Sequence, residues 1–198
     1  RVAASTWPDE AKKWDHLRNV EVSAVVGTVA ERRAALRRPA TIYTTNYEQL
    51  PWLVEELGDK WPFTKVVADE STKLKGFRLR QGGKRSAALA KVAHSKVRRF
   101  IELTGTPSPN GLQDLWGQAW FLDRGERLGR TYQAFMDRWF RAIRVGADPH
   151  AVQYKPLPTA QEQIQDRMRD ICLSLDARDW FDIREPIVTT VRVDLPTR

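Results

Sequence analysis

Two adjacent carboxylates follow a short apolar run near the middle of the chain. Asp69 and Glu70 come directly after residues 66–68, and an apolar run of this length between polar residues is typical of a buried strand. A second strand-like run, residues 100–103, is followed by the polar turn 104–107. Because open α/β sheets bind ligands at the carboxyl edge of their strands, we expect the acidic pair and the turn to share one site.

The residue types at these two strand ends suit the transfer of a phosphoryl group to water. That reaction needs a metal ion to neutralise phosphate charge and a group that orients the attacking water. Asp69 would hold Mg²⁺ through the water shell of the ion, and Glu70 would position or deprotonate the water. Thr104 and Thr106 offer hydroxyls, and Gly105 allows a close backbone turn beside the first strand end. An isolated acidic pair favours a solvated turn, but the combination predicts an ATP site.

The charge of the chain favours an anionic partner, and nucleic acid in particular. Its 33 Lys and Arg residues exceed its 25 Asp and Glu residues, which gives a net charge of +8. Segment 73–99 contains no acid. The expected phosphate contacts are Lys73, Lys75, Arg78, Arg80, Lys84 and Arg85, with Asn46 at a predicted helix end. A solvated basic face is the alternative, and a steep loss of binding with salt would distinguish the two.

The cysteine and histidine content argues against a structural metal and against disulfides. The chain has one cysteine and three widely separated histidines, with no spacing typical of metal ligands. Cys172 falls on the same predicted helical face as Ile164, Met168 and Leu175, so we expect a thiol in the core. Most of the eight tryptophans are likewise expected to pack inside the protein. No apolar run has the length of a membrane span, and no secretory signal is visible.

Predicted strands and helices alternate along the chain. The expected strands are residues 20–26, 40–45, 65–68, 99–103 and 187–195. The expected helices are 7–17 with a capping box at its start, 28–37, one that carries Leu50 to Leu57 and is capped by Asn46, 84–94, 110–121, 131–140 and 159–175. Segment 71–83 is expected to be a loop, and 145–158 an irregular surface segment. This order predicts an α/β fold with a mainly parallel sheet and helices on both faces.

Several short motifs together resemble those of the first RecA-like motor domain of superfamily 2 helicases, specifically the Swi/Snf-type DNA translocases of phages and prophages. Asp69-Glu70-Ser71-Thr72 stands where the family has its DEAH box, and Lys73-Leu74-Lys75-Gly76 is similar to the basic segment after it. The other similar segments are Leu103-Thr104-Gly105-Thr106-Pro107 with Asn110 and Asp114-Leu115-Trp116 (motif III), Thr44-Thr45-Asn46-Tyr47-Glu48, residues 1–14 and residues 186–196. The resemblance covers nearly the whole chain.

The resemblance implies a RecA-like P-loop NTPase fold and an ATP-dependent helicase or translocase that couples ATP hydrolysis to movement on DNA. It implies ATP and Mg²⁺ as cofactors, with Asp69 and Glu70 as catalytic residues and Thr104, Gly105 and Thr106 as the coupling motif. The implied partners are double-stranded DNA, contacted without regard to sequence, and a second RecA-like domain of the same protein. The implied location is the cytoplasm of a bacterial or phage-infected cell.

The chain departs from the family pattern in two places. Ser71-Thr72 replaces the usual Ala-His, which puts the coupling made by that histidine in doubt. No G-x-x-x-x-G-K-[ST] motif exists, because the only partial match, which ends in Lys84, has Arg78 where the first glycine belongs.

We therefore expect residues 1–198 to be one partial ATP-binding domain, with its P-loop upstream and the second motor domain downstream. This fragment alone would bind ATP weakly and not hydrolyse it. Two alternatives stay open: a degenerate, non-catalytic DNA-binding or scaffolding module, and a helicase subunit of a restriction or nuclease system.

Overall fold

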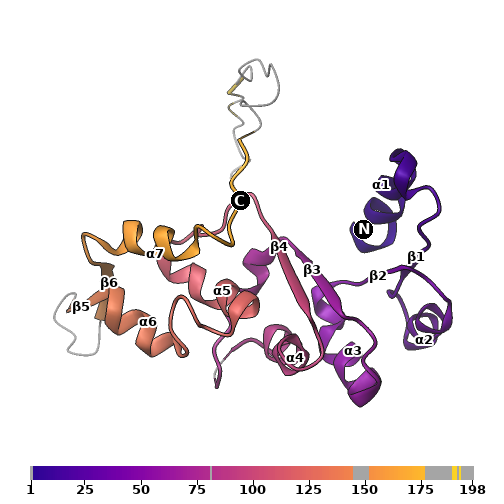
Figure 1. Cartoon of the computed structure of the whole chain (residues 1–198), viewed down its shortest axis with the longest axis horizontal. Coiled ribbons are helices and arrows are strands. Elements are labelled where there is room, and N and C mark those ends of the chain that lie inside the picture. Colours follow the sequence, from indigo (N-terminus) through magenta and orange to yellow (C-terminus); the bar gives the residue numbers. More distant parts are fainter. Residues whose placement is uncertain (1, 81, 145–151, 177–188, 191, 193–198) are drawn as a thin grey trace, which may run out of the picture.

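The strands of the protein form three pairs, two of them parallel (Figure 1). The computed structural model describes residues 2–80, 82–144, 152–176, 189–190 and 192. The strands are β1 (Val22–Ala24), β2 (Ile42–Thr44), β3 (Lys65–Asp69), β4 (Arg99–Leu103), β5 (Phe140–Arg144) and β6 (Val152–Pro156). β1 pairs with β2 and β3 with β4, both in parallel, whereas β5 and β6 are antiparallel. The α/β class with parallel strands is as predicted, but the described residues form separate pairs rather than one sheet.

Helices lie between the strands in the order that the sequence predicts. The α-helices are α1 (Trp7–Lys13), α2 (Val29–Arg37), α3 (Leu50–Leu57), α4 (Lys84–Ala93), α5 (Leu115–Asp123), α6 (Tyr132–Trp139) and α7 (Ala160–Met168). A π-helical turn, η1 (Val2–Thr6), precedes α1. The 3₁₀ turns are η2 (Asp15–Leu17), η3 (Tyr47–Gln49), η4 (Gly58–Lys60), η5 (Ser71–Leu74) and η6 (Leu112–Asp114).

The pair β3–β4 buries one of its faces and exposes the other. On the buried face Phe100 stacks on Phe121 of α5, with ring centroids 5.3 Å apart. On the opposite face Val67, Ile101 and Leu103 are 46%, 45% and 43% exposed. The prediction of helices on both faces is therefore wrong for β3–β4. An apolar run predicts two covered faces, but only one face of this pair is packed.

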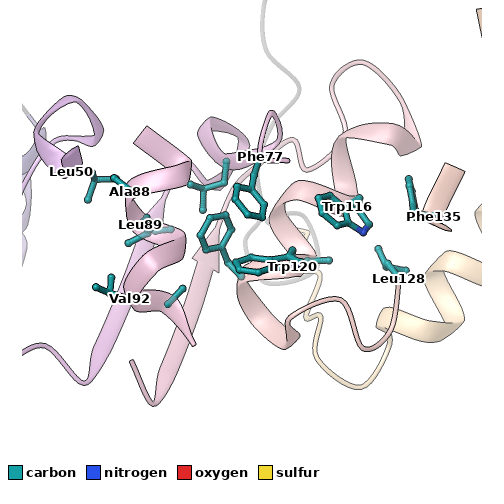
Figure 2. Packing of buried hydrophobic residues seen from close by; sticks show 14 of the residues in the cluster. Leu50, Phe77, Ala88, Leu89, Val92, Trp116, Trp120, Leu128 and Phe135 are labelled. Carbon is teal, nitrogen blue, oxygen red and sulfur yellow. The ribbon is translucent and has the colours of Figure 1, made fainter. Parts of the chain in front are cut away.

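The core lies between α4, α5 and the segment that follows β3. Figure 2 shows the ring of Phe77 between α4 and α5, beside Trp120 at a centroid distance of 4.5 Å. Trp116, Trp120 and Trp139 are buried, as predicted for most tryptophans, although Trp14 is exposed. Segment 71–83 is thus more than the predicted loop, since it contains η5 and contributes Phe77 to the core.

Two helix starts differ from their predicted caps. Thr6 has helical dihedral angles and no side-chain cap, because η1 leads directly into α1, and α1 ends at Lys13. The side chain of Asn46 caps neither α3 nor η3, which separates Asn46 from α3. A complete capping box instead begins α2, where Thr28 and Glu31 bond each other's backbone N–H groups.

The C-terminal part differs most from prediction. Helix α6 passes directly into β5, and residues 152–156 form β6 rather than an irregular segment. Helix α7 ends at Met168, so Cys172 falls beyond the helical period and is exposed; the predicted core thiol is wrong. The predicted strand 187–195 lies almost entirely outside the described residues. Among the described helices, none has the length and apolar character needed to cross a membrane.

Candidate functional site

The ends of β3 and β4 bring the acidic pair and the threonine turn together. The strands run parallel in a register that places Asp69 opposite Leu103, so Glu70 and Thr104 follow at the same edge. The hydroxyl of Thr104 donates to Glu70 Oε1 over 3.4 Å. The parallel ladder explains this contact, because it delivers both chain segments to one edge of the pair.

The carboxylate of Glu70 is held by two threonines. Thr72 donates its hydroxyl to Glu70 Oε1 at 2.8 Å, in addition to the bond from Thr104. Thr104 Oγ1 in turn accepts the backbone N–H of Thr106 at 3.1 Å, which fixes the turn. Gly105 does not have the expected steric role, because a Cβ there would meet no atom within 4 Å.

The backbone of Glu70 is left-handed, with φ 57° and ψ 56°. A residue with a Cβ adopts this conformation at a cost, and such strain is concentrated at functional sites. The conformation turns the chain out of β3 and into η5, so that Asp69 and Glu70 are both exposed at the strand end. The local backbone therefore presents two carboxylates to solvent beside the threonine turn.

Tyr47, which has no predicted role of its own, binds the backbone at the end of β3. Its phenol donates to the carbonyl oxygen of Asp69 at 3.0 Å and more weakly to that of Glu70 at 3.5 Å. Burial, together with the charges of Glu102, Asp69 and Glu70, raises the pKa of Tyr47, so the phenol stays a proton donor. The sequence signal for a role of Tyr47 is the similarity of the segment Thr44–Glu48 to a motif of the family.

Gln118 of α5 joins the segment after β3 to the segment after β4. Its Oε1 accepts the hydroxyl of Ser71 at 2.8 Å. Its Nε2 donates to the carbonyl oxygens of Pro107 at 2.6 Å and Asp114 at 3.0 Å. Ser71 and Gln118 are both buried. A glutamine among the apolar residues of α5 was the sequence signal for this link, since a buried amide requires partners.

Glu102 of β4 is a buried carboxyl close to the site. Its Oε1 has no hydrogen-bond partner among the described residues. Burial raises the pKa of Glu102 to about 9, so this group is neutral at pH 7. The two carboxylates of the candidate site are exposed, whereas this third carboxyl lies inside, on the packed face of the pair.

The predicted phosphate contacts fall into two groups. Lys73, Arg80 and Lys84 are exposed and make no ion pair with any described residue. The other three have internal partners: Lys75 pairs with Asp114 at 3.4 Å, Arg85 pairs with Glu48 at 3.1 Å, and Arg78 lies 3.4 Å over the ring of Tyr132. Arg78 also donates to the carbonyl oxygens of Lys75 and Phe77. The first group is the more available to a ligand.

The acidic pair is suited to a Mg²⁺ ion that is bound mainly by water and phosphate. No group of three or more His, Cys, Asp or Glu side chains in the described ranges could form a cage of protein ligands. Mg²⁺ bound beside a nucleotide commonly takes one or two carboxylates, with water and phosphate oxygens at its other positions. The exposed carboxylate of Asp69 matches that arrangement.

Comparisons with known proteins identify the family of the chain. The chain is 58% identical over 199 residues to a protein designated p41 from Acyrthosiphon pisum secondary endosymbiont phage 1. The alignment covers all of this chain and 43% of that relative, so the chain spans less than half of the phage protein's length. Residues 2–183 match the SNF2-related domain. The chain therefore belongs to the SNF2-related family of Swi/Snf-type, helicase-like proteins.

Proposed function

We propose that this chain is part of a RecA-like lobe of an ATP-driven motor that moves on duplex DNA. The observation that carries the proposal is the bond between Thr104 and Glu70 at 3.4 Å, made where two adjacent parallel strands end. It joins an exposed carboxylate that can act on water to the turn that follows the neighbouring strand. Membership of a family of helicase and translocase motors supports the same assignment.

Each residue at the strand ends has a distinct task in this proposal. Mg²⁺ bound with ATP supplies neutralisation of the phosphate charge. Asp69 holds the water shell of that ion with its exposed carboxylate. Glu70 orients the attacking water and accepts its proton, while the hydroxyls of Thr72 and Thr104 keep the carboxylate in place. Tyr47 positions the backbone that carries both acids.

Two links would pass a change at the acidic pair to the turn after β4. The first runs from Glu70 through Thr104 to the backbone N–H of Thr106. The second runs from Ser71 through Gln118 to the carbonyl oxygen of Pro107. A movement of the segment after β3 would therefore displace the turn 104–107 through both of these bonds. This is a physical route by which the nucleotide state can reach the rest of the lobe.

DNA would be held through its phosphates by Lys73, Arg80 and Lys84, which are exposed and form no ion pair with any residue that the structure describes. Such contacts fix the position of a duplex without reading its sequence, which suits a motor that must move along any DNA. In the full-length protein a second RecA-like domain and a phosphate-binding loop would complete the ATP site. Hydrolysis would then alternate the grip of the two lobes on the duplex.

Replacement of Glu70 by glutamine in the full-length protein tests this proposal. The Glu70→Gln variant keeps the shape of the side chain but cannot take up a proton. We expect DNA-stimulated ATP hydrolysis to fall by about 10²- to 10⁴-fold with ATP affinity unchanged. Turnover by phosphate release and binding by fluorescent-nucleotide titration measure the two effects. The matched control is Glu55→Gln on α3, an exposed glutamate outside the site, which should leave turnover unchanged.

The outcomes separate the motor from its competitors. Wild-type turnover in the Glu70→Gln protein would remove Glu70 from its proposed task. A wild-type protein that binds DNA but neither binds nor hydrolyses ATP would support the non-catalytic DNA-binding or scaffolding module instead. A nuclease domain elsewhere in the full-length sequence would support the helicase subunit of a restriction or nuclease system.

A further inference from the structure

The hairpin β5–β6 is firmly anchored at its base. Trp139 and Phe140, where α6 passes into β5, are both buried. Trp139 accepts the backbone N–H of Leu157 at 2.8 Å through its carbonyl oxygen, and its indole N–H donates to Gln163 of α7 at 3.0 Å. The strands extend from this base at the end of the molecule opposite α1 (Figure 1). The base of the hairpin is therefore fixed by buried side chains and by hydrogen bonds to the segment that contains α7.

Two like charges face each other on this hairpin and destabilise it. Arg141 of β5 and Lys155 of β6 lie directly opposite each other in the antiparallel register, so their side chains share one face. Both are exposed, and neither makes an ion pair with a described residue. Arg144 adds a third cation, and the two strands contain no acid. Like charges directly opposite in a sheet repel each other, so an anionic partner would relieve this pair.

The other face of the hairpin carries Arg144 and a phenol. Tyr154 is 42% exposed and lies opposite Ala142, next to the pair of Arg144 and Val152. A phenol hydroxyl is a common donor to phosphate oxygens. Phosphate contacts of this kind need no apolar pocket.

We propose that the hairpin β5–β6 is a second DNA contact, in which Arg141 and Lys155 bind phosphates of the duplex. This inference rests on the proposed function, because it assumes that the protein acts on DNA. The Cβ atoms of opposed residues are about 5 Å apart, so neighbouring phosphates of one strand can neutralise both cations. The hairpin and the cations after β3 are separate surfaces, and together they would give the lobe two points of grip.

The test is a double substitution in the full-length protein. In Arg141→Gln/Lys155→Gln both cations become neutral amides that retain long side chains. We expect the affinity for a fluorescein-labelled 30-base-pair duplex of mixed sequence to fall about tenfold at low salt. The slope of log Kd against log salt should become shallower by about 1 to 2. The thermal unfolding midpoint should not fall, since the substitution removes a repulsion.

Two matched variants make the result specific. Arg37→Gln/Lys60→Gln removes the same charge from exposed positions outside the hairpin and should change the affinity less than twofold. The exchange Arg141→Lys/Lys155→Arg keeps both charges and should bind DNA as the wild-type protein does. Agreement of both controls with these expectations supports a local contact rather than an effect of net charge.

The contrary outcomes are equally distinct. If the double variant keeps the wild-type Kd and salt slope while Lys73→Gln/Lys84→Gln loses affinity, the hairpin proposal fails and the proposed function stands. If the wild-type protein does not bind duplex DNA, both fail. If the double variant keeps its DNA affinity but no longer binds vesicles containing phosphatidylserine, the surface faces a membrane and the proposal is wrong.

Discussion

Glu70 shows how one residue can be both strained and well supported. Its left-handed backbone costs on the order of 1–2 kcal/mol for a residue with a side chain. Two threonine hydroxyls hold its carboxylate, and the Tyr47 phenol binds the backbone beside it. Such retained strain is expected at a functional position, which is the role that we propose for Glu70.

The buried carboxyl of Glu102 makes stability depend on pH. Burial raises its pKa in the folded protein from 4.5 to about 9. Between these values the folded state holds a proton that the unfolded state has lost. The free energy of unfolding therefore falls as pH rises through this window, by up to about 1.4 kcal/mol per pH unit.

We expect Glu102→Gln to remove this dependence. The variant should gain stability over the wild-type protein at pH 8 and differ little from it at pH 4.5. Chemical denaturation at several pH values measures the difference. Glu126→Gln, at an exposed position, is the control and should follow the wild-type curve. A constant offset between Glu102→Gln and wild type at all pH values would contradict the assignment.

At the scale of elements, Gln118 connects segments that the two strands only bring near each other. Gln118→Leu preserves the size of the side chain but leaves the Ser71 hydroxyl and the Pro107 carbonyl without this partner. We expect a loss of about 1–3 kcal/mol in the free energy of unfolding, measured with urea. Gln161→Leu on the exposed side of α7 should change it by less than about 0.5 kcal/mol. Equal losses in the two variants would argue against the link.

Local patterns predicted the elements that carry the site, and long-range contacts account for what was missed. Strand β4 (Arg99–Leu103) has its predicted bounds because its apolar run ends at a clear polar turn. Strand β6 was missed although Val152 and Tyr154 alternate with polar residues, because the run is only five residues long and ends in Pro156, and such a short pattern with a proline also fits a surface segment. The bonds made by Tyr47 and Gln118 join segments 22 and 47 residues apart, and no local pattern encodes such partners.

At the scale of the whole molecule, two cationic surfaces and one apolar stripe are exposed. The cations after β3 and those on β5–β6 are candidate DNA contacts. The apolar stripe of Val67, Ile101 and Leu103 lies on the open face of β3–β4. The candidate site could be predicted from sequence because its motifs are local, whereas the open face could be recognised only after the helices had been placed.

We expect the stripe to cause self-association of the 198-residue chain. Burial of such apolar surface between copies is favourable by roughly 25 cal/mol per Å². Val67→Thr/Ile101→Thr should reduce the associated fraction in light scattering while retaining residues that favour strands. Val29→Thr, at an isolated exposed valine on α2, should not. Equal scattering from all three proteins would show that the stripe is not responsible.

The positive net charge of the chain opposes this association, because copies repel one another. Added salt screens that repulsion but leaves the attraction between apolar faces intact. The same salt would release bound polyanions from the arginines and lysines. Raising the ionic strength should thus replace complexes with polyanions by self-association of the protein. A high-salt buffer chosen to remove nucleic acid during purification would itself promote aggregation.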